Sequence, residues 1–159
     1  MEQQDKTLGL SGGAHGVFVG EYHHSLDPKK RLTIPSEWRD HVGDPCSVYV
    51  LPGIDKKCLT VFPAREMVQR LEKLRNLSIA DTKARQFLRI LGSQSQLAPW
   101  DSVGRIRIKD ELLKFADLND EVVLAGEFQG FELWNPDLWK ETSSEGGTNL
   151  GEAARYVGF

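Results

Sequence analysis

Two five-residue motifs carry the side chains of this chain that are best suited to recognising a partner. They read Asp-Pro-Lys-Lys-Arg at residues 27–31 and Asp-Ser-Val-Gly-Arg at residues 101–105. The planar guanidinium of an arginine can bind a carboxylate, a phosphate or the edge of a base through two parallel hydrogen bonds. In each motif the aspartate could hold the arginine in a local ion pair, or it could hold the loop while the arginine contacts a partner. The two lysines of the first motif would be superfluous in an ion pair, so we assign Arg31 mainly to partner binding and leave Arg105 open between the two roles.

Both motifs have the composition of a tight turn. Asp27 and Asp101 can accept backbone N–H groups at the first turn position, and Pro28 presets φ at the second. Gly104 stands where a type I turn followed by a bulge needs a left-handed backbone. Lys30 occupies that place in the first motif, where it either accepts the left-handed conformation at a cost of about 1–2 kcal/mol or alters the turn. We therefore expect Asp27, Asp101 and Gly104 to stabilise the turns.

The two motifs belong to a tandem repeat with an offset of 74 residues, since 101 − 27 and 105 − 31 both equal 74. The alternating apolar residues that follow keep this offset, as Leu32 corresponds to Ile106 and Ile34 to Ile108. Each copy predicts a strand, a turn, a strand, a short helix and two further strands joined by a turn. The first strand is expected to open at Val17. We place the first repeat at residues 17–63 and the second at residues 97–140.

Helices are predicted within the repeats and between them. Ser36 and Asp110 are candidate N-caps of the two short helices, the first of which should end at Gly43. Apolar residues at helical spacing predict two connecting helices within residues 64–96. Their apolar stripes favour core packing over a ligand pocket. A contact with another subunit is a third interpretation, because each four-stranded unit alone is thin.

Both ends of the chain have compositions that do not predict a packed core. Residues 1–16 contain few apolar side chains, which indicates a disordered tail or an incorrectly assigned start, with Val17 as the first native residue. The intact mass of the native protein distinguishes these two interpretations. Residues 141–159 include a stretch rich in Gly, Ser and Glu and are predicted to be a flexible tail.

Composition limits the classes of protein to consider. At 159 residues, with 40% hydrophobic and 27% charged residues, the chain suits one compact domain or two half-domains that share a core. No apolar run approaches the roughly 18 residues that a membrane-spanning helix needs, so no membrane partner is expected. The net charge of −3 argues against a general nucleic-acid coat, but it is compatible with a local basic patch.

The remaining reactive side chains do not form a recognisable catalytic or metal-binding pattern. Cys46 and Cys58 lack the spacing of a metal site and are expected to be free thiols, buried or half-buried. His23 and His24 are adjacent on a predicted strand and therefore point to opposite faces, so they cannot share a metal ion. Because the sequence offers no nucleophile–base pair, phosphate-binding loop or metal spacing, we expect no enzymatic activity and no cofactor.

Some further residues that could contact nucleic acid have simpler interpretations. Trp38 and Trp134 fall at apolar positions of the repeat and are expected in the core. Arg39 is expected to pair with Glu37 or Asp40. Three basic residues of the second connecting helix most simply form a solvated face: Lys83, Arg85 and Arg89.

The first motif and its surroundings, residues 20–35, resemble the opening of the MraZ proteins. Residues 101–106 and 131–134 resemble the second repeat of the same family, and the whole resemblance covers about residues 17–140. It implies an α+β fold, namely a duplicated swapped-hairpin (AbrB-like, SpoVT-AbrB) β-barrel with short helices and a two-helix insertion between the halves. The chain departs from the family pattern at Lys30, where glycine is usual, at Lys109, where proline is usual, and at Val19.

The resemblance also implies a function. It indicates a sequence-specific DNA-binding transcriptional regulator, expected to repress the division and cell-wall gene cluster including its own operon. Such proteins form ring homo-oligomers, such as octamers or dodecamers, in the bacterial cytoplasm and nucleoid, and they bind G-rich direct repeats in double-stranded DNA. In this chain the guanidinium of Arg31 matches the N7 and O6 acceptors of guanine, and lysines suit phosphates. The expected DNA-binding residues are Lys29, Lys30, Arg31, Arg105 and Arg107.

One alternative function stays open at this point. A ring-forming interaction protein could use the same basic loops to bind a protein or RNA partner, because arginine loops also suit acidic proteins.

Overall fold

The computed structural model describes residues 17–43, 45–76, 80–146 and 150–159, so the predicted tail at 1–16 lies outside the described residues. Within these ranges the protein has a mixed α+β fold of eight strands and six helices. The strands form one six-stranded antiparallel sheet and one separate two-stranded ribbon.

The order of elements repeats along the chain, as the duplication predicted. The first copy contains β1 (Glu21–Ser25), β2 (Arg31–Thr33), α3 (Ser36–Val42), β3 (Ser47–Pro52) and β4 (Leu59–Pro63). Helices α4 (Ala64–Leu74) and α5 (Thr82–Gln94) follow. The second copy contains β5 (Gln96–Pro99), β6 (Arg105–Arg107), α6 (Asp110–Phe115), β7 (Glu121–Gly126) and β8 (Phe131–Trp134), and the chain ends with α7 (Pro136–Gly146) and α8 (Leu150–Val157).

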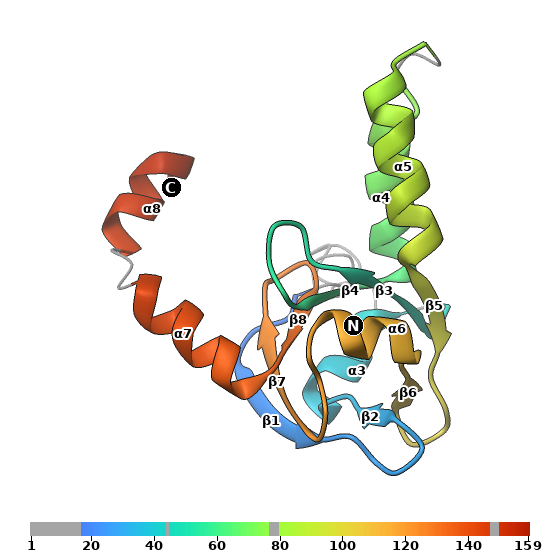
Figure 1. Ribbon diagram of the computed structural model, residues 1–159, viewed down its shortest axis with the longest axis vertical. Helices are drawn as coiled ribbons and strands as arrows, with labels where there is room; N and C mark the ends of the chain where they lie inside the picture. Colours follow the sequence, from blue (N-terminus) through green and yellow to red (C-terminus); the bar gives the residue numbers. More distant parts are fainter. Residues whose placement is uncertain (1–16, 44, 77–79, 147–149) are drawn as a thin grey trace, which may run out of the picture.

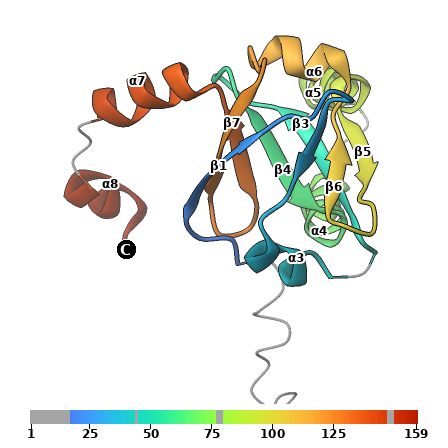
Figure 2. The same ribbon diagram turned by 90° about the horizontal axis from the view of Figure 1, so that it is seen from below.

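The two copies exchange their first strands. The strand order of the large sheet is β1-β7-β8-β4-β3-β5, so β1 of the first copy lies on β7 of the second, and β5 of the second copy lies on β3 of the first. The sheet is not closed on itself, because β1 and β5 are its two edges. The remaining strand of each copy forms the β2–β6 ribbon, which Figure 2 shows beside the sheet. Neither copy could form these pairings alone, so the two copies build one structure.

The main hydrophobic core of the described residues lies between the ribbon and the sheet. The alternating apolar residues that defined the repeat, Leu32, Ile34, Ile106 and Ile108, are fully buried in it. Trp38 is buried beside Phe18 and Phe131, and its indole Nε1–H donates a hydrogen bond of 2.9 Å to the carbonyl oxygen of Val19. Trp134 is buried in a separate, smaller cluster with Cys58 and Val123, so the buried positions predicted for both tryptophans are confirmed.

Three predicted element boundaries need correction. The first strand begins at Glu21 rather than at Val17, although Phe18 forms an isolated bridge with Phe128. Ser36 and Asp110 are the first helical residues and not N-caps, because Pro35 and Lys109 precede them in extended backbone and make no side-chain cap. The short helix α3 ends at Gly43 as predicted, where φ is 73°.

Helices α4 and α5 form a hairpin that projects from the body of the molecule (Figure 1). The base of this hairpin packs on the sheet through Met67, but α5 buries none of its residues. Apolar side chains of both helices are exposed by 41–56%, among them Val68, Leu71, Phe87 and Ile90. The apolar stripes therefore extend beyond the core of one chain.

The C-terminal segment contains helices where the sequence suggested a flexible tail. The end of α7 and the whole of α8 fall within residues 141–159, and they lie to one side of the body in Figure 1. Leu150, Tyr156 and Phe159 are at least 82% exposed, so α8 buries no apolar side chain against the body. Within the described residues, no helix is both long and apolar enough to cross a membrane.

Candidate functional site

The two Asp-x-x-x-Arg motifs form nearly identical turns. In the first, Oδ1 of Asp27 accepts hydrogen bonds from the backbone N–H groups of Lys29 and Arg31, at 2.9 and 2.8 Å. In the second, Oδ1 of Asp101 accepts the equivalent bonds from Val103 and Arg105, at 3.0 and 2.9 Å. Each aspartate uses the backbone of its own turn, so the predicted turn-stabilising geometry of both residues is present.

The arginine of each turn also forms an ion pair with its aspartate. Nε of Arg31 lies 2.6 Å from Oδ2 of Asp27, and Nε of Arg105 lies 2.8 Å from Oδ2 of Asp101. The local ion pair is therefore present in both copies, whereas the sequence had assigned Arg31 mainly to a partner. The two roles are not alternatives, because each ion pair uses Nε. Within the described residues the terminal Nη atoms of both arginines make no hydrogen bond.

These hydrogen bonds favour the ionised form of both carboxyl groups. The backbone N–H of Arg31 is the largest influence that holds the pKa of Asp27 below its usual value, and burial opposes it; the Arg31 side chain and the N–H of Lys29 lower the pKa further. The corresponding groups of Arg105 and Val103 hold the pKa of Asp101 below its usual value in the same way. Both aspartates therefore carry a full negative charge at neutral pH, which fixes the orientation of each guanidinium.

The residues at the glycine position of the two turns both adopt a left-handed backbone. Gly104 has a φ of 80°, as predicted, and Lys30 has a φ of 63°. Of the two outcomes considered for Lys30, the structure shows the strained backbone with an unchanged turn, since Lys30 N–H donates to Asp27 O at 2.9 Å and Gly104 N–H donates to Asp101 O at 3.0 Å. Lys30 and its neighbour Lys29 are both exposed.

The β2–β6 ribbon places the two turns at its opposite ends. Ile108 N–H donates to the carbonyl of Lys30, and Ile34 N–H donates to the carbonyl of Gly104. Each turn thus lies next to the far end of the other copy's strand. The sequence had predicted two similar turns, but it gave no sign that the two strands which follow them pair with each other.

The outward face of this ribbon is basic. Leu32 and Ile106 face each other in the core, so the flanking residues of both strands point to the opposite face. Arg31 is paired in register with Arg107, and Thr33 with Arg105. Three predicted DNA-binding arginines therefore share one face that links the two turns. Arg107 is the most exposed of them and also reaches back to Ile108 O and, at 3.9 Å, to Asp110.

Arg39 is a residue of this region whose environment the sequence did not predict. It does not pair with Glu37 or Asp40; its Nε donates a hydrogen bond of 3.0 Å to the carbonyl of Ile34, beside the second turn. The space beside Gly104 that receives this side chain is apparent only in the folded chain, so no residue pattern in the sequence indicated the contact.

Other candidate residues lie away from the turns or have local partners. Cys46 and Cys58 are free thiols, and Cys58 is buried, but Cys46 is exposed and not half-buried as expected. His23 bonds to Glu21, and His24 bonds to the carbonyl of Thr33. No three metal-binding side chains gather within the part of the chain that the structure describes.

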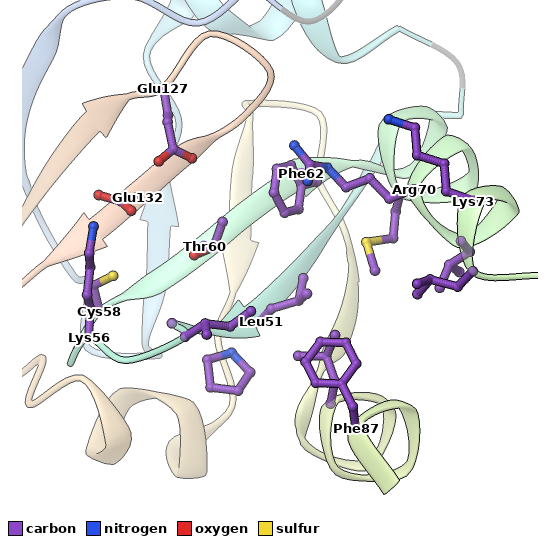
Figure 3. Close-up of a pocket in the computed structure, with 17 residues that line it drawn as sticks. Leu51, Lys56, Cys58, Thr60, Phe62, Arg70, Lys73, Phe87, Glu127 and Glu132 are labelled. Atoms are coloured by element: carbon purple, nitrogen blue, oxygen red, sulfur yellow. The ribbon is translucent and has the colours of Figure 1, made fainter. Parts of the chain in front are cut away.

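A cavity of about 440 Å³ lies between the α4–α5 hairpin and strands β3 and β4 (Figure 3). Its walls are largely apolar, with Leu51, Phe62 and Phe87 among the lining residues, and Glu127 and Glu132 lie at one end. Burial, and then the charge of Glu132, raise the pKa of Glu127. No residue of either turn lines this cavity, so it is separate from the basic ribbon.

Comparisons with known proteins bear on both halves of the chain. A family profile described as "MraZ protein, putative antitoxin-like" matches residues 17–90 and 94–155. A transcriptional regulator MraZ of Finegoldia magna is 33% identical over 138 residues, which cover 87% of this chain and 94% of the relative. A protein of the same name from Oenococcus oeni is 36% identical, covering 89% of this chain and 96% of the relative, and one from Clostridium acetobutylicum is 34% identical, covering 79% and 86%.

Proposed function

Because the chain belongs to the MraZ family, whose members are named as transcriptional regulators and not as enzymes, we propose that it is a sequence-specific DNA-binding regulator of transcription. We propose further that it represses the division and cell-wall gene cluster that includes its own operon, and that it binds G-rich direct repeats there. The observation that supports DNA binding most strongly is the basic β2–β6 ribbon, which has at each end an arginine that is oriented by an ion pair with an aspartate.

The first turn has the chemistry of a guanine reader. Asp27 engages Nε of Arg31 and leaves the edge formed by the two Nη groups available. Guanine presents N7 and O6 in the major groove, and an arginine that binds both acceptors discriminates against other bases by about 1–3 kcal/mol. Because the ion pair already fixes the guanidinium, less side-chain entropy is lost on binding. Lys29 and Lys30 extend from the same turn and suit phosphate contacts.

In this proposal the second turn contacts the DNA backbone. Ile34 bonds to Gly104 of the second turn, so the distance along the ribbon from Lys30 to Ile34 approximates the separation of the two turns. These four residue steps of roughly 3.4 Å amount to about 14 Å. The major groove is about 12 Å wide. With the first turn in the groove and the ribbon lying across it, the second turn would come near one of the flanking phosphate backbones. Arg105, with Arg107 beside it on the ribbon face, supplies the positive charge there.

Repetition of the ribbon in a ring would make weak single contacts effective. We propose a homo-oligomeric ring, such as an octamer or dodecamer, whose contacts include the exposed apolar side chains of α4 and α5 and the sheet edges β1 and β5. Direct repeats with matching spacing would then bind several ribbons at a raised effective concentration. A net charge of −3 per chain limits non-specific association, while the ribbons stay locally basic.

The exchange of first strands between the copies supports the duplicated swapped-hairpin (AbrB-like) description of the fold. In that description the open sheet and the β2–β6 ribbon are two parts of one barrel-like core. The proposed site of action is the nucleoid in the bacterial cytoplasm.

A gel-shift series with DNA from upstream of the protein's own operon tests the proposal. Wild type and Arg31→Ala are compared between about 50 and 200 mM salt, with Arg155→Ala on α8 as a matched loss of one charge away from the ribbon. Wild type and the control should bind with an affinity that falls steeply with salt, because phosphate contacts release counterions. Arg31→Ala should lose the preference for guanine.

Binding by Arg31→Ala that keeps its affinity and its preference for guanine would remove Arg31 as the reader. Wild type that binds RNA or an acidic protein but not this duplex would instead favour the interaction-protein alternative. Native mass spectrometry of the same samples measures the subunit number, and a monomer at all concentrations would contradict the ring.

A further inference from the structure

Arg39 reaches from the first copy of the repeat onto the turn of the second copy. A Cβ atom added to Gly104 would lie 2.4 Å from Nε of Arg39 and 2.6 Å from its Cζ. The guanidinium therefore fills the space that a side chain at position 104 would occupy. Nε is held by the carbonyl of Ile34 at 3.0 Å, and the two Nη atoms have no hydrogen-bond partner among the described residues.

The first turn has the opposite arrangement. With the 74-residue offset of the repeat, Gly104 corresponds to Lys30 and Arg39 corresponds to Leu113. The first turn thus carries its own cation on a left-handed backbone, and the residue equivalent to Arg39 is an apolar side chain that is only 5% exposed. The second turn has no lysine, and helix α3 of the other copy brings an arginine to the same position.

We infer that Arg39 is a phosphate-binding residue of the second turn, where it supplies the cation that Lys30 supplies at the first. The inference rests on the proposed DNA binding and adds a contact residue to it. Gly104 serves two purposes in this arrangement. It adopts the positive φ that the turn requires, and it leaves room for the guanidinium beside Arg105. The carbonyl of Ile34 binds only one edge of Arg39, so the other edge is available to a phosphate.

The expected effect is a loss of affinity without a change in sequence preference, because phosphate contacts carry no base information. Arg39→Gln should reduce the slope of log affinity against log salt by about 0.9 for each second turn that engages DNA. Between 50 and 200 mM salt, wild type should then lose about threefold more affinity per engaged turn than the variant. Arg155→Gln, an exposed arginine on α8, removes the same charge and should keep the wild-type slope.

Moving the positive charge from position 39 to position 104 distinguishes phosphate binding by Arg39 from a purely structural role. The double variant Arg39→Leu/Gly104→Lys rebuilds the arrangement of the first turn at the second, and it should recover the wild-type salt slope, whereas Arg39→Leu alone should not. Thermal melts and native mass spectrometry establish that each variant is folded and assembled.

The outcomes distinguish this inference from the proposed function. If wild type binds DNA steeply with salt but folded Arg39→Gln has the same slope, Arg39 is not a contact and only this inference fails. If Arg39→Leu and the double variant are equally impaired, position 39 acts through structure and the inference also fails. If wild type shows no DNA binding, the proposed function fails first.

Discussion

Replacing Lys30 by glycine should make the protein more stable and a weaker DNA binder. Lys30 has a φ of 63°, which costs a non-glycine residue about 1–2 kcal/mol. Glycine removes that strain but increases the entropy of the unfolded chain, which offsets about 0.4–1 kcal/mol. The backbone bonds of the turn are retained, so Lys30→Gly should raise the free energy of unfolding by about 0.5–1 kcal/mol.

Lys29 provides the matched control in the same turn. It is not among the residues with positive φ, so Lys29→Gly has only the entropic penalty and should destabilise by about 0.4–1 kcal/mol. Both variants remove one exposed lysine and keep the N–H groups that bond to Asp27. The two substitutions therefore change the charge equally and the stability in opposite directions.

Urea unfolding at one fixed protein concentration measures the difference, since assembly makes stability depend on concentration. The midpoint should rise for Lys30→Gly and fall for Lys29→Gly with unchanged m-values. In a chain of this size each kcal/mol corresponds to about 2–4 °C in Tm. In DNA titrations, each variant should reduce the salt slope by about 0.9 for every first turn that loses a phosphate contact. A lower midpoint for Lys30→Gly than for wild type would refute the strain at position 30, and unchanged salt slopes for both variants would refute the phosphate contacts.

Three further predictions concern the core, the thiols and acid stability. Trp38→Ala should cost about 3–5 kcal/mol in urea unfolding, because Trp38 is only 1% exposed; a loss below about 1 kcal/mol would contradict its central place in the core. The protein is treated with a maleimide at about pH 8, and mass spectrometry should find Cys46 modified in the folded protein but Cys58 only after denaturation. Cys58 should be protected because it is buried and burial raises its pKa to about 12. Rapid modification of both thiols in the folded state would contradict this. Because the pKa values of Asp27 and Asp101 are lowered by folding from 3.8, their contribution to stability is fully present above about pH 4 and is lost as the pH falls through the folded-state pKa values. The double variant with asparagine at both positions should therefore lose less stability than wild type on acidification, and equal losses in urea unfolding at successive pH values would count against the depressed pKa values.

Much of the fold could be predicted because its signals are local and occur twice. The alternation of Leu32 and Ile34, repeated at Ile106 and Ile108, identified the core face of the ribbon strands before their pairing was known. The turn chemistry of the two motifs was equally local, since an aspartate that accepts N–H groups from the next few residues depends only on nearby backbone.

Contacts between residues far apart in the chain were harder to predict from the sequence. Pairing of β1 with β7 and of β5 with β3 joins segments that are far apart in the chain, and neither has a residue pattern that identifies its partner strand. Arg39 was assigned to nearby acidic residues because charge proximity in sequence is visible, whereas the space left by Gly104 is visible only in three dimensions. The predicted N-caps were wrong by one residue. Pro35 and Lys109 have extended backbones and are the N-cap residues, so the helices begin directly at Ser36 and Asp110.

The contact between Arg31 and guanine is tested most directly by changing single atoms of the DNA. Each guanine of the bound repeat is replaced in turn by 7-deazaguanine, which lacks the N7 acceptor, and affinities are measured for wild type and Arg31→Lys. At the contacted guanine, wild type should lose about 1 kcal/mol, or roughly fivefold in affinity, because one of two acceptors is removed. Arg31→Lys, which keeps the charge but not the paired donors, should be much less sensitive to the same change. The account would be contradicted if the affinity of wild type did not change with 7-deazaguanine at any position, or if Arg31→Lys lost as much affinity as wild type at the contacted guanine.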